Sequence, residues 1–345
     1  MLSLQKNFMR ISLYKTINPS IPLIVLWLAS CLFVWFLPAK ILPQYLESQN
    51  VLPVVQFLQT ILPATNIVTN ITCLVLAMAN GILLHQLNNI FALVREKTFI
   101  PFLTFIILIS VFHSTHYNIT ANLALTFLLI AFFIFLKLYR NSQQTEAAFL
   151  SSFLIACIGW LFLPEFLLLF VPVWLALVQL RAISLRVFLA TLVGLITPAI
   201  FCFVFNQNYF QIFVSYCENI GFKWQLFKEI YINIQSIFFA IMLIILILSL
   251  WGIYTNALLN NIRTRTNLNF ILLFFISIII IIIIFPQAFY MFLPILFALF
   301  AVFLSHPVTL RTSNFYGIMF IVFCVINLIL VLYNLIFYYL SLLTD

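Results

Sequence analysis

The stretch FILLFFISIIIIIIIF at residues 270–285 contains a single polar residue, Ser277, and includes seven consecutive isoleucines at 278–284. In water, β-branched residues such as isoleucine favour strands. In a bilayer this preference does not decide the structure. A single segment must form all its backbone hydrogen bonds within itself there, and only a helix does so. A membrane barrel would instead show short segments of alternating polarity. The stretch therefore predicts a membrane-spanning helix and an all-α fold.

Ten other windows have the same apolar character. Of the 345 residues, 66% are hydrophobic and 6% are charged, whereas a soluble domain carries about 25% charged residues. This composition excludes a soluble enzyme, a nucleic-acid-binding domain and a disordered protein. One span needs about 20 apolar residues, so we expect a polytopic membrane helix bundle of about eleven transmembrane helices. The windows are 20–38, 67–86, 98–113, 119–138, 147–163, 165–180, 187–206, 232–255, 268–285, 287–304 and 314–340.

The basic residues predict how the bundle is oriented. When the N-terminus is placed in the cytoplasm, twelve of the fifteen Lys and Arg residues fall in cytoplasmic segments and three fall outside. Cytoplasmic loops of membrane proteins carry such an excess. The pairs 147–163/165–180 and 268–285/287–304 are hinged near Pro164 and Pro286, and one bent helix in either place would invert all later segments. The split thus predicts two spans in each pair and a C-terminus on the side opposite the cytoplasm.

We expect residues 1–345 to form one integral membrane domain whose longest outer segments are 41–65 and 207–231. The first of these is too polar to span and too apolar for a free loop. Its apolar residues have helical spacing, which predicts an amphipathic helix on the outer membrane surface or, as the alternative, a loop that caps the bundle. These residues are Val51, Val54, Val55, Leu58 and Leu62.

Motifs for cofactor or metal chemistry are missing from the sequence. It has no Walker loop, no dinucleotide fingerprint, no HExxH and no GxSxG. The one Asp is terminal, and no two acidic residues stand within three positions of each other. We therefore expect no cofactor and no local metal cradle. Neutral polar residues inside the windows, such as Asn80, Asn122 and Thr126, either line a cavity or form single interhelical hydrogen bonds.

The predicted outer face carries the candidate catalytic residues, which are Glu47, His113 and Glu165. His113 and its neighbour His116 lie in the short turn between the third and fourth spans. Glu165 follows Pro164 at the next outer turn. Histidine and glutamate at a membrane boundary can act as general acid and base. The alternative is that they are solvated loop ends.

The predicted inner face carries the candidate anion-binding residues. Arg95 and Lys97 precede the third span, and Arg181 and Arg186 join the sixth to the seventh. Arginine pairs with phosphate groups through two parallel hydrogen bonds, so these residues could bind a phosphate or a lipid headgroup. The alternative is that they are topological anchors only.

Three segments of the sequence resemble a family of uncharacterised polytopic inner-membrane proteins of Bacteroidota, catalogued as a domain of unknown function. The resemblance covers about residues 67–205. It implies lineage and location in the cytoplasmic (inner) membrane, with a periplasmic C-terminus, but no activity. The segments are LNN at 87–89 through REKTFIP at 95–101, PE at 164–165, and LRAISLRVFLA at 180–190.

The order of the predicted segments resembles the C-type glycosyltransferase fold. That fold implies a polyprenyl-phosphate-linked substrate at the outer leaflet and a catalytic base in the first outer loop. Glu47 would be this base, with Glu165 and His113 in support, although Glu47 is not paired with an Asp. The expected function is thus a glycosyltransferase-like role on lipid-linked substrates in envelope biogenesis. A non-catalytic membrane scaffold or assembly partner is the alternative, and a transporter is third. The expected partners are the lipid bilayer and this substrate, with no nucleic acid.

Overall fold

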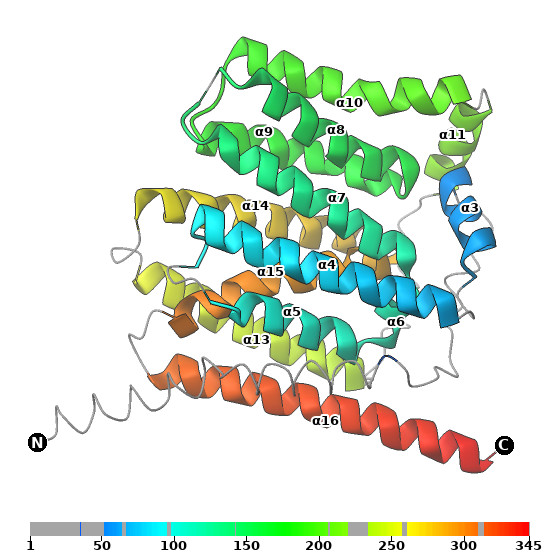
Figure 1. The fold of residues 1–345 in the computed structure, drawn as a ribbon, viewed down its shortest axis with the longest axis vertical. Helices are drawn as coiled ribbons and strands as arrows, with labels where there is room; N and C mark the ends of the chain where they lie inside the picture. The colour runs from blue at the N-terminus through cyan, green and yellow to red at the C-terminus, as the bar shows by residue number, and fades with distance from the viewer. Residues whose placement is uncertain are drawn as a thin grey trace, which may run out of the picture.

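The computed structural model describes residue 35 and residues 52–63, 67–94, 98–141, 143–205, 208–219, 234–256, 261–309 and 314–344. Every element in these ranges is helical, which confirms the predicted all-α class (Figure 1). The elements are α3 (Pro53–Ile61), α4 (Ile67–Phe91), α5 (Ile100–Val111), α6 (His113–His116), α7 (Ile119–Phe135), η2 (Leu136–Leu138), α8 (Thr145–Leu161), η3 (Pro164–Leu169), α9 (Phe170–Gln179), α10 (Leu185–Phe205), α11 (Tyr209–Asn219), α13 (Ile234–Thr255), α14 (Ile262–Ile284), η5 (Pro286–Ala288), α15 (Phe289–Thr309) and α16 (Asn314–Thr344).

Seven of these helices are long and apolar enough to cross a membrane: α4, α7, α10, α13, α14, α15 and α16. Three other predicted windows contain shorter apolar helices. They are α5 with 12 residues, α8 with 17, and the combined stretch Pro164–Gln179. The first window, 20–38, lies outside the described residues apart from Trp35. The count of about eleven spans therefore stays a prediction, while the helical positions agree with the sequence.

The chain doubles back at Pro164. The backbone N–H of Arg140 donates to the carbonyl of Leu180 at 2.9 Å, so the end of α9 lies beside the turn that leads into α8. Because α8 begins at Thr145, the start of α8 and the end of α9 share one end of the bundle. Residues 145–180 are thus an antiparallel hairpin and not one bent helix.

The chain doubles back again at Pro286. The Asn267 side chain near the start of α14 donates to the carbonyl of Phe91 at the end of α4, at 3.0 Å. The Thr120 hydroxyl at the start of α7 contacts the Met291 sulfur near the start of α15, at 3.3 Å. Phe91 packs against Phe133, near the opposite end of α7 from Thr120. The α14 helix therefore crosses the bundle and α15 returns.

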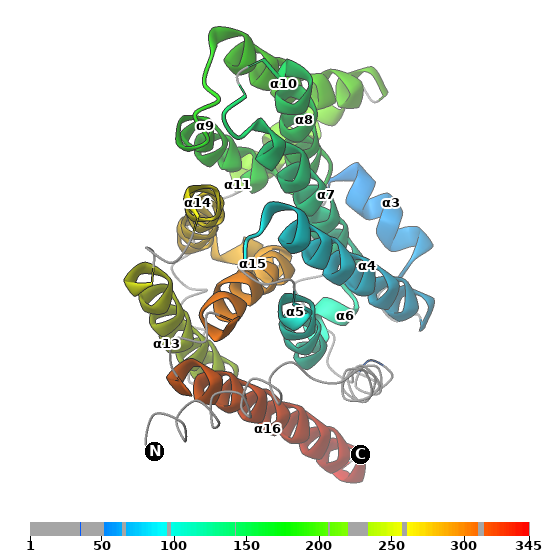
Figure 2. The same cartoon turned by 60° about the vertical axis from the view of Figure 1, so that its left-hand side comes forward.

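The core of the bundle surrounds α15. Of its apolar span 89% is buried inside the protein, against 22% for α10 and 33% for α16. Figures 1 and 2 show α10 and α16 at opposite edges of the molecule, with α15 between them. The helices at the edges of the bundle expose rows of Ile, Val and Phe. Such surfaces suit contact with acyl chains and not with water.

One prediction concerns topology. We expect a periplasmic reporter, such as alkaline phosphatase, to be active when it is fused after Asp345 in the full chain, because two hairpins at 145–180 and 262–309 preserve the predicted alternation. A cytoplasmic reporter at the same place should be inactive. The reverse pattern would contradict the orientation.

Candidate functional site

The helix ends gather on two faces of the bundle. In Figure 1 the short helices α3, α6 and α11 lie together at the right-hand ends of the long helices. The starts of α8 and α14 and the ends of α4 and α9 lie at the left-hand ends. We call the first the α3 end and the second the α14 end. The sequence predicts that the α3 end is the outer one.

The turn between α5 and α7, at the α3 end, is held by buried polar contacts. The His116 ring stacks on the Trp35 indole with 4.0 Å between centroids, and its Nε2 lies 3.1 Å from the carbonyl oxygen of Ser110. The Trp35 indole N–H donates to the Ser110 hydroxyl at 3.0 Å, and the Asn70 amide donates to the Trp35 carbonyl. His116 is fully buried, so it is part of the packing and not a solvated loop end.

Asn122 organises the same turn from the first part of α7. Its amide donates to the carbonyls of Thr115 at 2.9 Å and Asn118 at 3.0 Å. The backbone carbonyl of Asn122 accepts hydrogen bonds from the Asn80 side-chain amide on α4 and from the Thr126 hydroxyl. These neutral polar residues form hydrogen bonds within and between helices, which is one of the two roles that the sequence leaves open.

Of the three predicted catalytic residues, the structure describes the side chain of Glu165 only. Glu47 lies outside the described residues, and His113 belongs to α6 while its side chain is outside the described part. Glu165 is 3% exposed, in the first turn of η3. The start of α15 contacts both the start of α7 and η3. Met291 contacts Thr120, and Phe292 stacks on Phe166 with 4.2 Å between ring centroids. The structure thus places Glu165 in the interior at the α3 end, and the acid–base set stays a prediction.

An apolar groove opens beside α3. Its volume is about 390 Å³, within the range of about 300–1,000 Å³ for small-molecule pockets. The Tyr209 hydroxyl donates to the carbonyl of Trp160 and ties the start of α11 to the end of α8. Burial raises the pKa of Tyr209 above its ordinary value, so the hydroxyl keeps its proton and remains a donor. The groove is lined by Pro53, Val54, Phe57, Leu161, Phe201, Cys202 and Tyr209.

The helix α3 forms one wall of this groove. Val55 is buried, and Val54, Leu58 and Leu62 pack against the core of the bundle. The apolar face noted in the sequence is therefore a packing face against the other helices. The sequence missed the groove because its residues come from four separate segments with no shared motif.

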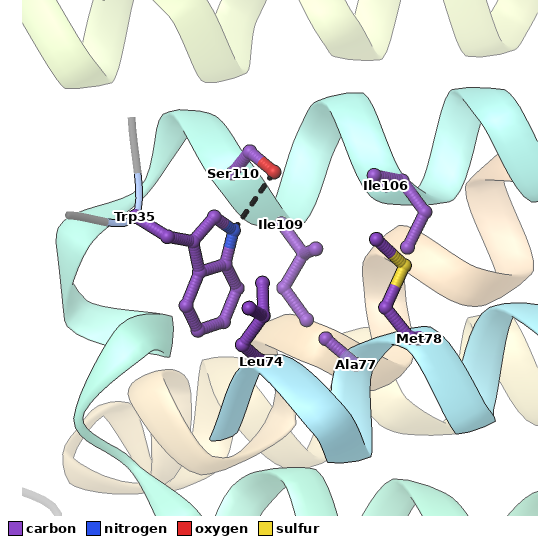
Figure 3. Close-up of a pocket in the computed structure, with 7 residues that line it drawn as sticks. All are labelled: Trp35, Leu74, Ala77, Met78, Ile106, Ile109 and Ser110. Carbon is purple, nitrogen blue, oxygen red and sulfur yellow. Dashed lines mark hydrogen bonds between the residues drawn. The ribbon is translucent and has the colours of Figure 1, made fainter. Parts of the chain in front are cut away.

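A second hollow, between α4 and α5, is closed. Figure 3 shows the Trp35 ring filling one end of it, with Met78 and Ile106 at the other. It has no volume that a water molecule could occupy. Close packing of this kind leaves no room for a substrate path between these two helices.

The α14 end is basic. Arg181 and Arg186 are exposed there, whereas Arg95 and Lys97 lie outside the described residues. The structure adds three cations that the sequence did not single out, Lys137, Arg140 and Arg263, each above an aromatic ring. Within the described ranges, no three His, Cys, Asp or Glu side chains gather as a metal site would require.

Together these features define a polytopic helical membrane protein, with seven candidate spanning helices in the part of the chain that the structure describes. No protein-family model, curated protein or solved structure matches the chain. The resemblances to the Bacteroidota family and to the C-type glycosyltransferases therefore stay predictions.

Proposed function

We propose that the protein acts on a lipid-linked substrate in envelope biogenesis and holds the substrate's apolar chain in the groove beside α3. The observation that carries the proposal is this groove of about 390 Å³ with an almost wholly apolar lining. An apolar groove among membrane helices favours a hydrocarbon chain over a sugar or a nucleotide, because a polar ligand would leave its hydrogen bonds unmade there.

Two of the proposed acid–base residues lie a few positions along the chain from residues that line the groove. Glu165 follows the groove residue Leu161 by four positions and is buried at the same end of the bundle. Glu47 precedes the groove residue Pro53 by six positions. A carboxylate beside a bound lipid phosphate could act as general base and take the proton of an acceptor hydroxyl. The acceptor oxygen would then bond to the sugar as the sugar–phosphate bond breaks and the polyprenyl phosphate leaves. We therefore propose glycosyl transfer as the reaction, with Glu47 as the base and Glu165 and His113 in support.

The first test is chemical profiling of a deletion strain. We expect lipid-linked sugar intermediates to accumulate when the protein is absent, because their consumption would stop. Extraction of the lipids and mass spectrometry of the polyprenyl-phosphate pool would measure this. An unchanged pool would defeat the transferase proposal.

Filling the groove tests the binding step. We expect Val54→Trp to lose most of the ability to restore a normal lipid-linked pool in the deletion strain, because the indole would occupy the space of the chain. The control is Val75→Trp, the same change on α4 at a side chain that is 62% exposed and outside the groove. Equal complementation by both variants would place the substrate elsewhere.

The role of Glu165 separates chemistry from packing. We expect Glu165→Gln to abolish complementation while the amount of folded protein stays normal, because the amide keeps the shape of the side chain but cannot exchange a proton at neutral pH. Activity would be read as the lipid-linked pool, and folding as the size-exclusion profile in detergent. Full complementation by this variant would remove Glu165 from the proposed mechanism.

A scaffold is the second candidate, and the dense packing around α15 favours it. The hollow beside Trp35 is closed to water, and α15 is the most buried of the candidate spans. A scaffold would tolerate both Glu165→Gln and Val54→Trp, so the experiments above also distinguish the two candidates.

A further inference from the structure

We propose that a cluster of cations and aromatic rings at the α14 end binds the headgroup phosphate of an anionic phospholipid in the adjoining leaflet. The cluster lies at the other end of the bundle from the groove, so the proposal does not depend on the proposed transferase activity. We call it the basic–aromatic cluster. It consists of Lys137, Arg140 and Arg263 with the rings of Phe91, Phe133 and Tyr139.

Two guanidinium groups share one ring in this cluster. The Cζ of Arg140 lies 5.4 Å from the centroid of the Tyr139 ring, and the Cζ of Arg263 lies 6.0 Å from the same centroid. Arg263 also lies 5.9 Å from the Phe91 ring. Tyr139 follows η2 and Arg263 is near the start of α14, so the ring brings together cations that are far apart in the sequence.

Lys137 joins the cluster through the Phe133 ring, which packs against Phe91. Its Nζ lies 5.1 Å from the centroid of the Phe133 ring, and Phe133 packs edge-to-face on Phe91 at 5.4 Å. Phe91 is 2% exposed and therefore a fixed support. The three cations are exposed above these rings, so an anion can reach them.

No carboxylate neutralises the cluster in the part of the chain that the structure describes. None of the three cations forms an ion pair there, and none has an interaction beyond the ring contacts given above and those of its backbone. Glu146 in the first turn of α8 is exposed and has no ion pair with them. An aromatic ring holds a cation in place without cancelling its charge. The cluster thus presents positive charge that a phosphate can pair with through charge-assisted hydrogen bonds.

Two turns with left-handed backbone angles lie beside the cluster and are joined by a hydrogen bond. Arg140 and Arg181 both have left-handed backbone angles, with φ of 58° and 55°, a conformation that is unfavourable for a residue with a Cβ. The hydrogen bond from the Arg140 N–H to the Leu180 carbonyl joins their two turns. Arg181 is consequently next to the cluster and exposed, and it adds a fourth positive charge to this face.

The location favours a lipid over a soluble anion. Phe91 is the last residue of α4 and Phe133 lies in the last turn of α7, two candidate membrane spans, and Arg263 is in the first turn of a third, α14. The ends of spanning helices lie at the depth of the lipid headgroups, where anionic lipids supply phosphate at high local concentration. Tyrosine, as at Tyr139, suits the same boundary.

The test is binding of phosphatidylglycerol to the purified full-length protein, measured as retained lipid by native mass spectrometry, with phosphatidylcholine as the neutral comparison. We expect wild type to retain phosphatidylglycerol selectively. The double variant Arg140→Gln/Arg263→Gln should bind it about tenfold more weakly, since it loses two charge-assisted contacts. Arg265→Gln, also in α14, removes one charge from the same end of the bundle outside the cluster. A loss as large from this variant would mean that any cation serves, which would overturn the proposal.

A variant with unchanged net charge separates a built site from general attraction. We expect Tyr139→Leu to weaken binding about fivefold, because both guanidinium groups lose their shared ring, and Tyr139→Phe to bind as wild type does. Melting temperatures of the two variants check folding. Full retention of lipid by Tyr139→Leu would contradict the role of the ring. Displacement of the lipid by millimolar inorganic phosphate would assign the site to a soluble anion and overturn the choice of a lipid.

Discussion

Gly194→Ala is expected to destabilise the protein by about 2 kcal/mol, because α8 and α10 meet backbone to backbone at this position. A Cβ on Gly194 would lie 2.7 Å from the carbonyl oxygen of Phe149 and 3.0 Å from the amide nitrogen of Phe153. Neither atom can rotate away, so the whole helix must move. Membrane helices rely on small residues for such approaches. The bulkier Gly194→Leu should prevent stable folding.

The effect should be large because α10 has few other attachments. It packs mainly on α8, and the Trp174 indole N–H on α9 donates to the Thr191 hydroxyl at 3.3 Å. Most of its remaining surface is exposed to lipid. Displacing α10 would also open the groove, since Phe201 and Cys202 line it.

Thermal melting of the detergent-purified protein would measure the change, and we expect the Gly194→Ala midpoint to fall by about 5 °C. The matched control is Gly81→Ala. There the added Cβ would lie 2.7 Å from a ring carbon of Phe102, and this half-buried ring can turn aside, so the midpoint should change little. A larger fall for Gly81→Ala than for Gly194→Ala would contradict the backbone-contact argument.

The helical positions could be predicted from the sequence because the bilayer leaves few choices. Long apolar windows such as 268–285 must be helical, and Pro164 and Pro286 mark the breaks between α8 and η3 and between α14 and η5. The lengths of the shorter helices were less predictable. The α5 helix begins at Ile100 and ends before Phe112, where the backbone becomes extended. The apolar window continues past this point because hydropathy does not register a turn made of Phe and His.

The candidate sites could be predicted only in part, because they depend on contacts between distant segments. The position of Glu165 after Pro164 drew attention to it, but its burial follows from packing of η3 against α8 and α14. The groove and the basic–aromatic cluster left no local motif. The adjacent Tyr139 and Arg140 could have indicated a cation above an aromatic ring. The approach of Arg263 to the same ring, however, depends on the fold.

Asn122→Leu is expected to cost about 3 kcal/mol, because it removes the donor that holds the turn between α5 and α7. Its amide donates to the carbonyls of Thr115 and Asn118, and a buried carbonyl that loses its partner costs about 1–3 kcal/mol. Water cannot replace the donor, since Asn122 and Thr115 are both buried.

The Asn122 prediction has a matched control in Thr126→Val, which keeps the shape of the side chain and removes only the hydroxyl contacts to Asn80 and Asn122. Hydrogen bonds between membrane helices are worth about 0.6 kcal/mol on average, so this control should change the melting midpoint little. Amide hydrogen exchange over residues 112–118 should rise sharply in Asn122→Leu and stay near wild type in Thr126→Val. Equal exchange in the two variants would mean that the turn is held by the stacking of His116 on Trp35 and by the packing around it. In that case the His116 ring, and not the Asn122 amide, would be the residue that fixes the predicted outer turn.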